Sequence, residues 1–272
     1  MSAPCISAAS AEAAKEARLE ALRKAVEGLQ GFPATPPAAS PSDDVRPSLA
    51  FLAQGVPGLA CGALNEVLAA AHGDRPAAFG FLFTLTAAAL GEGPGPAVFI
   101  AATRALAEFG RPYGHGLAQR GLDVGRLILI ETRTDKDALW ALEETLRSGA
   151  RPAMVAGALD GGLDLTASRR LNLAAAAHRT PLAVLRGAKA SGAGAAASRW
   201  RIAAAPAARD RFGAFAAPRW HVALERSRNA RPGQWLIEWN PVESPHVAHR
   251  FRLVEGLADR PPAESAGLRR AG

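Results

Sequence analysis

The stretch 69–77 is where nucleotide chemistry would be expected in this chain. It follows the first apolar run of the core, and in nucleotide-hydrolysing α/β proteins that strand is followed by G-x-x-x-x-G-K-[ST], whose amides and lysine hold phosphates and whose hydroxyl holds magnesium. The corresponding residues here are His72, Gly73, Asp74, Arg75 and Pro76, without a GK[ST]. Arg75 could replace the lysine charge, but Pro76 has no amide donor, Ala77 has no hydroxyl, and Asp74 would repel a phosphate. The sequence therefore predicts a degenerate loop without ATP hydrolysis, no catalytic residue and no cofactor.

Other residue types that support catalysis or metal binding are scattered. The 6 histidines lack the spacing of a helical metal pair, and the 2 cysteines, Cys5 and Cys61, are too few for a zinc site or a disulfide framework. Asp160 ends an apolar run, as a magnesium-holding aspartate would. Because no phosphate loop lies beside it, we interpret Asp160 as a turn residue, and we predict no metal site.

Two groups of arginines with neighbouring tryptophans are candidates for binding single-stranded DNA, in a chain of formal net charge +7. The arginines are Arg199, Arg201, Arg226, Arg228 and Arg231. In the alternative interpretation, the tryptophans pack inside a sheet and the arginines form its solvated rim. The alternation of apolar residues around Trp220 and Trp235 favours this packing interpretation.

The pattern of apolar runs predicts an α/β fold with a mostly parallel sheet flanked by helices. Strands are expected at 62–68, 96–101, 126–131, 152–159 and 181–185, and helices at 77–90, 117–121, 134–148 and 164–178. The chain then changes character, with short strands expected at 200–204, 220–225 and 234–240. The last two alternate strictly, so we predict that they pair as an antiparallel C-terminal hairpin.

The chain divides into four segments by composition. Residues 1–30 contain an amphipathic helix, 31–48 form a proline-rich linker, 49–240 form the core and 241–272 form a tail. The apolar stripe of the first helix is a candidate surface for partners or self-association, and consists of Leu19, Leu22, Val26 and Leu29. The sequence shows neither a secretory signal nor a membrane span, so we expect a cytoplasmic protein.

Several peptides resemble the ImuA family, RecA-like accessory proteins of bacterial damage-inducible mutagenesis. They are GVPGL (55–59), ALWALEE (138–144), LDLTASRRL (163–171), SRWRI (198–202), PRW (218–220), LER (224–226) and RPGQWLIEW (231–239). The resemblance covers most of 49–240 and implies a RecA-like core. It also implies a complex with the Y-family-polymerase homologue ImuB and an error-prone DNA polymerase III α-type subunit in SOS mutagenesis, with RecA as a further candidate partner.

A wider resemblance to the RecA recombinase implies that this chain lacks residues that a recombinase uses for catalysis and for DNA binding. Thr103 stands where a recombinase has its catalytic glutamate, and the segments 160–164 and 187–198, at the positions of the DNA-binding loops, are poor in charge apart from Lys189. We therefore expect a non-catalytic adaptor for translesion synthesis. An ATP-dependent RecA-type DNA-binding protein and a SulA-like cell-division inhibitor are the alternatives.

Overall fold

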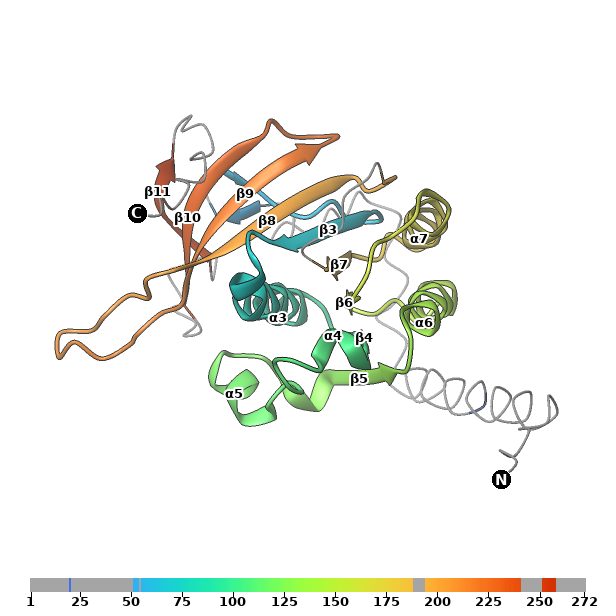
Figure 1. Ribbon diagram of the computed structural model, residues 1–272, viewed down its shortest axis with the longest axis horizontal. Coiled ribbons are helices and arrows are strands. Elements are labelled where there is room, and N and C mark those ends of the chain that lie inside the picture. Colours follow the sequence, from blue (N-terminus) through green and yellow to red (C-terminus); the bar gives the residue numbers. More distant parts are fainter. Residues whose placement is uncertain (1–19, 21–50, 54, 188–193, 241–250, 258–272) are drawn as a thin grey trace, which may run out of the picture.

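The computed structural model describes residues 20, 51–53, 55–187, 194–240 and 251–257 (Figure 1). The predicted partner-binding residues Leu19, Leu22, Val26 and Leu29, the proline-rich linker and Lys189 lie outside the described residues.

A nine-stranded sheet in the order β11-β10-β9-β8-β3-β7-β6-β4-β5 forms the centre of the protein. The strands are β3 (Leu64–Ala69), β4 (Ala97–Ala102), β5 (Leu127–Thr132), β6 (Met154–Ala158), β7 (Leu182–Arg186), β8 (Ser198–Ala205), β9 (Arg219–Ser227), β10 (Gly233–Trp239) and β11 (Phe251–Leu257). All neighbours from β8 to β5 pair in parallel, whereas β9, β10 and β11 add antiparallel pairings. The predicted mostly parallel sheet with antiparallel C-terminal strands is confirmed. A separate pair, β1 (Phe51–Ala53) and β2 (Val56–Pro57), precedes it.

Helices cover both faces of the parallel part (Figure 1). Helix α3 (Arg75–Glu92) lies on one face, and α6 (Asp135–Arg147) and α7 (Leu165–Ala177) lie on the other. Because α3 is apolar on nearly every side, it is buried. Predicted capping residues begin the other two helices: the Thr134 hydroxyl accepts the Asp137 amide at 3.1 Å, and the Asp164 carboxylate accepts the Ala167 amide at 2.6 Å.

The tryptophans of the antiparallel C-terminal strands pack into the core: Trp220 and Trp239 are buried, Trp235 is half-buried, and Trp220 contacts α3. Trp220 pairs with Ile237 and Val222 with Trp235, as the predicted hairpin requires. The Trp220 indole donates to the Ala77 carbonyl at 3.0 Å, and its ring lies 5.8 Å from that of Phe81. The packing interpretation of the tryptophans is therefore confirmed.

The sheet extends beyond residue 240, the predicted end of the core. β11 comes from within the expected tail and pairs with β10, and the buried Phe251 ring lies 4.9 Å from that of Trp239. Two short helices also connect strands: α4 (Thr103–Leu106), which was not predicted, and α5 (Gly114–Gln119), close to the helix expected at 117–121. The 3-10 turns η1 (His72–Asp74) and η2 (Val124–Arg126) precede α3 and β5.

Candidate functional site at the carboxyl edge of the sheet

The carboxyl ends of β3, β4, β5, β6 and β7 share one edge of the sheet, which is where open α/β sheets bind their ligands. The turn between β3 and α3 lies at this edge and contains the degenerate loop residues. η1 covers His72, Gly73 and Asp74, and α3 begins with Arg75 and Pro76. The orientation of Asp74 and Arg75 decides what this turn can bind.

Asp74 uses both of its carboxylate oxygens to close the turn. Its Oδ2 accepts the amide of Ala71 at 3.1 Å, and its Oδ1 accepts the amide of Ala204 in β8 at 2.9 Å. The Asp74 carboxylate thus takes up backbone amides that would otherwise be available to an anion. Its negative charge also repels phosphate oxygens.

Arg75 is directed into the protein, and its side chain is only 7% exposed. Its Nη2 donates to the carbonyl of Leu159, just after β6, at 3.0 Å and to that of Ala105 at 3.5 Å. Burial lowers the pKa of the Arg75 guanidinium from its ordinary value, although Asp160, Glu108 and Asp135 oppose the shift. Arg75 therefore satisfies carbonyls and carboxylates of the chain, instead of facing a bound phosphate.

Carboxylates surround this turn. Asp160, which follows β6, lies 3.6 Å from the guanidinium of Arg104, and Glu108 lies 2.8 Å from the His72 imidazole. Asp135 accepts the amides of Asp160 and Gly161 at 3.0 and 2.7 Å, so it organises the turn after β6. In the described part of the chain, no group of three or more histidine, cysteine, aspartate and glutamate side chains could hold a metal ion.

Thr103 begins α4 directly after β4. Its hydroxyl donates to the Thr132 carbonyl at the end of β5, at 2.8 Å. A hydroxyl used in this way joins two strand ends and offers no carboxylate to activate a water molecule.

The segments after β6 and β7 pack directly on each other. The Gly187 amide lies 3.4 Å from the Gly161 carbonyl oxygen, and a Cβ at Gly187 would lie 2.1 Å from the Asp160 carbonyl oxygen. Only glycine allows this approach of two backbones. The segments 160–164 and 187–198, which were expected at the positions of recombinase DNA-binding loops, therefore begin within the packed edge.

A buried ion cluster links β3, β7 and β8. Glu66 in β3 is fully buried, and its two carboxylate oxygens accept from Arg186 of β7 and Arg199 of β8, each at 2.8 Å. A buried carboxylate needs such partners, because an uncompensated charge is costly in the protein interior. Glu66 and Arg186 were not among the predicted site residues. Their signal in the sequence is a single acidic residue in β3 and a single basic residue in β7, in strands that carry no other charge.

Four of the five candidate DNA-binding arginines are bonded to the protein itself. Arg199 bonds to Glu66, and Arg201 pairs with Glu225. Arg226 and Arg228 donate to the carbonyls of Gly194 and Ala195, at 3.2 and 2.8 Å, and so attach the segment before β8 to the end of β9. Arg231 is exposed and has no hydrogen-bond or ion-pair partner among the described residues. The structure thus brings Arg199, Arg226 and Arg228 together at the start of β8, with Arg201 further along the strand.

The chain matches no protein-family model. Protein ImuA of Caulobacter vibrioides, in strains NA1000 / CB15N and ATCC 19089 / CIP 103742 / CB 15, is 38% identical to it over 230 residues, which cover 79% of this chain and 89% of the relative. The chain belongs to the ImuA family. In this ImuA-family protein, the turn after β3 at the carboxyl edge of the sheet is closed by the chain's own Asp74 and Arg75. None of the helices in the described ranges has both the length and the apolar character needed to cross a bilayer.

Proposed function

We propose that this ImuA-family protein is a non-catalytic, RecA-like adaptor of damage-induced mutagenesis that acts in the cytoplasm and supports translesion DNA synthesis by binding other proteins. Family membership supports the biological system. The observation that carries the adaptor mechanism is the turn after β3, where Asp74 closes the backbone and Arg75 bonds to the Leu159 carbonyl. A turn filled in this way favours a role without nucleotide turnover.

The proposed partners are an ImuB-like Y-family polymerase homologue and an error-prone DNA polymerase III α-type subunit, with RecA as a third candidate. The surfaces proposed for them are the apolar stripe of the N-terminal arm (Leu19, Leu22, Val26 and Leu29) and the C-terminal segment. Direct binding of single-stranded DNA by the arginines is less well supported, because four of the five bond to carboxylates or carbonyls of the chain.

A pull-down tests the proposed partnership. The tagged full-length chain is co-expressed with the ImuB-like protein of the same organism, and we expect the two to be retained together equally with and without Mg-ATP. A Leu22→Glu/Val26→Glu variant should retain less of the partner, whereas a Lys15→Glu variant, changed outside the apolar stripe, should behave as wild type. Failure of the unmodified chain to retain the ImuB-like protein, while a known complex is retained in parallel, would contradict the proposal.

A further inference from the structure

The connection between β8 and β9 extends away from the sheet and ends in an ordered tip, residues 209–215 (Figure 1). The Asp210 amide donates to the Ala214 carbonyl at 2.9 Å, and the Asp210 carboxylate accepts the amides of Phe212 and Ala214 at 2.8 and 2.9 Å. Arg209 and Phe215 form a β-bridge across the tip. The tip therefore has a defined backbone conformation although it extends away from the sheet.

The tip presents two phenyl rings to solvent. Phe212 and Phe215 are each 78% exposed. The guanidinium of Arg211 lies 4.6 Å from the Phe212 ring centre, and that of Arg209 lies 4.8 Å from the Phe215 ring centre. Aromatic rings and arginines are the residues most enriched at the centres of protein interfaces. The tip thus has the chemistry of an interface anchor whose counterpart is an apolar pocket with carboxylates near its rim.

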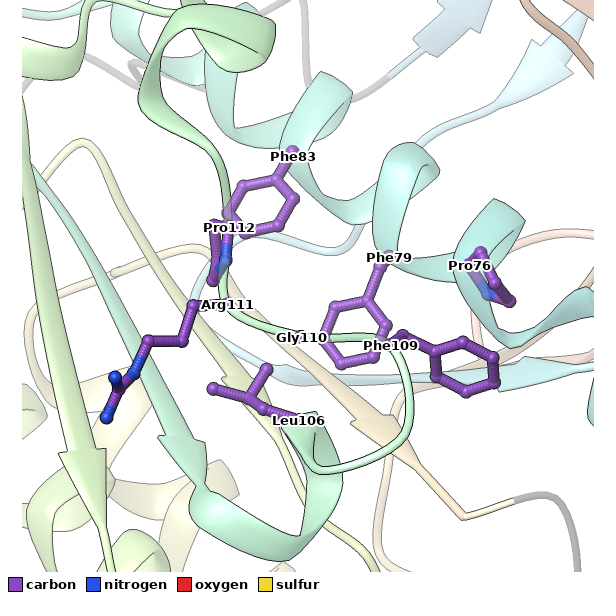
Figure 2. A pocket seen from close by; sticks show the side chains of 8 residues that line it. All are labelled: Pro76, Phe79, Phe83, Leu106, Phe109, Gly110, Arg111 and Pro112. Carbon is purple, nitrogen blue, oxygen red and sulfur yellow. The ribbon is translucent and has the colours of Figure 1, made fainter.

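The same chain contains a pocket of that kind (Figure 2). It lies between the start of α3 and the connection from α4 to α5, has a volume of about 180 Å³, and is lined mainly by Pro76, Phe79, Phe83, Leu106, Phe109 and Pro112. An apolar cavity of about 150 Å³ accommodates a benzene molecule. The pocket is therefore large enough for one phenyl ring.

The charges near the pocket complement those of the tip. Glu108 is next to Phe109 in the sequence and its side chain is half exposed. Arg111 also lines the pocket, but its charge is paired with Glu131 at 2.6 Å. Glu108 also pairs with His72 at 2.8 Å, so an incoming Arg209 or Arg211 would share this half-exposed carboxylate with the imidazole.

We infer that the tip of one copy enters the pocket of a second copy, so that the protein self-associates through Phe212 and Phe215. On their own chain both rings are exposed, so the tip does not fill the pocket of the same molecule. A second copy supplies both an apolar pocket and the nearby carboxylate of Glu108. Single-stranded nucleic acid fits less well, because the tip carries only two cations to neutralise phosphates.

Sedimentation velocity of the full-length chain over a wide concentration range tests this inference. We expect species of two or more copies for the wild type. Phe212→Ala/Phe215→Ala removes the rings, and Phe109→Asp places a charge in the pocket, so each variant should raise the dissociation constant at least about tenfold, the effect of losing one well-buried anchor. The matched controls are Leu165→Ala/Leu173→Ala, two exposed residues of α7, and Phe109→Leu, which keeps the pocket apolar. Both should behave as wild type.

Mixing the two defective variants provides the decisive test. The Phe109→Asp protein keeps its tip and the Phe212→Ala/Phe215→Ala protein keeps its pocket, so an equimolar mixture should form complexes that neither variant forms alone. A wild type that stays monomeric, self-association unchanged in the tip variant, or a mixture that does not associate would overturn the inference. A wild type that remains monomeric but binds an oligo-dT probe through the two phenylalanines would overturn it as well.

Discussion

At the scale of single residues, the turn after β3 satisfies its polar groups internally. The Asp74 carboxylate accepts amides from two segments of the chain, and the Arg75 guanidinium donates to carbonyls at the ends of neighbouring elements. In a phosphate-binding turn, such amides and such a cation would face the ligand. Asp74 and Arg75 are accordingly expected to contribute to stability, and their loss should change unfolding more than ligand binding.

Arg75→Ala should destabilise the protein by about 1.5–3 kcal/mol, because the Leu159 carbonyl loses a charged donor and Asp160 and Glu108 lose a compensating charge. Urea unfolding followed by tryptophan fluorescence measures the effect. Arg104→Ala is the matched control, because this arginine is exposed and only loosely paired with Asp160; its effect should be less than about 0.5 kcal/mol. Equal stability of the two variants would contradict a structural role for Arg75.

Glu66→Ala should cost about 3–5 kcal/mol, because it leaves the guanidinium groups of Arg186 and Arg199 without their carboxylate in the interior. Thermal unfolding monitored by circular dichroism checks this. The comparison variant is Glu225→Ala, which removes the half-exposed partner of Arg201 and should cost less than about 1 kcal/mol. If Glu66→Ala unfolds at the same temperature as Glu225→Ala, the buried cluster does not stabilise the folded state more than an exposed ion pair does.

At the scale of elements, much of the fold could be predicted from sequence. Fully buried parallel strands appear as continuous apolar runs, and the capping residues Thr134 and Asp164 mark where helices begin. The alternation in β9 and β10 also predicts their pairing. The lateral order of the strands is not encoded locally, and for that reason the Glu66 cluster, in which β3 lies between β7 and β8, could not be predicted. β11 was missed because its apolar residues follow a proline-containing stretch and alternate only weakly.

Phe251→Ala tests whether β11 belongs to the folded core. The buried ring contacts those of Trp239 and Phe81, at centroid distances of 4.9 and 6.0 Å, so its removal should cost about 3–5 kcal/mol. Chemical denaturation provides the measurement, and Val254→Ala, which changes an exposed residue of the same strand, should have little effect. A wild-type unfolding midpoint for Phe251→Ala would mean that the core ends at β10.

At the scale of the whole molecule, the net charge of +7 does not by itself create a DNA-binding surface. Of the five candidate arginines, only Arg228 and Arg231 are exposed, and Arg228 still donates to a carbonyl. This arrangement of the arginines supports the proposed adaptor role more than a DNA-binding role.

The salt dependence of oligonucleotide binding measures the contribution of the two exposed arginines. Each phosphate contact on a single strand contributes about −0.7 to the slope of log K against log salt concentration, so Arg228→Ala/Arg231→Ala should change the slope by no more than about 1.4. Fluorescence anisotropy with labelled oligo-dT gives the slope. A larger change would assign a more extensive DNA-binding site to this region.

Calorimetric titration of the full-length chain with Mg-ATP tests most directly whether the turn after β3 is filled by the protein's own side chains. Because Asp74 and Arg75 already bond to neighbouring backbone groups, we predict no saturable heat of binding for the wild type. Saturable binding that disappears in a folded Arg75→Ala variant would contradict this account, because it would mean that Arg75 can leave the Leu159 carbonyl and hold a phosphate.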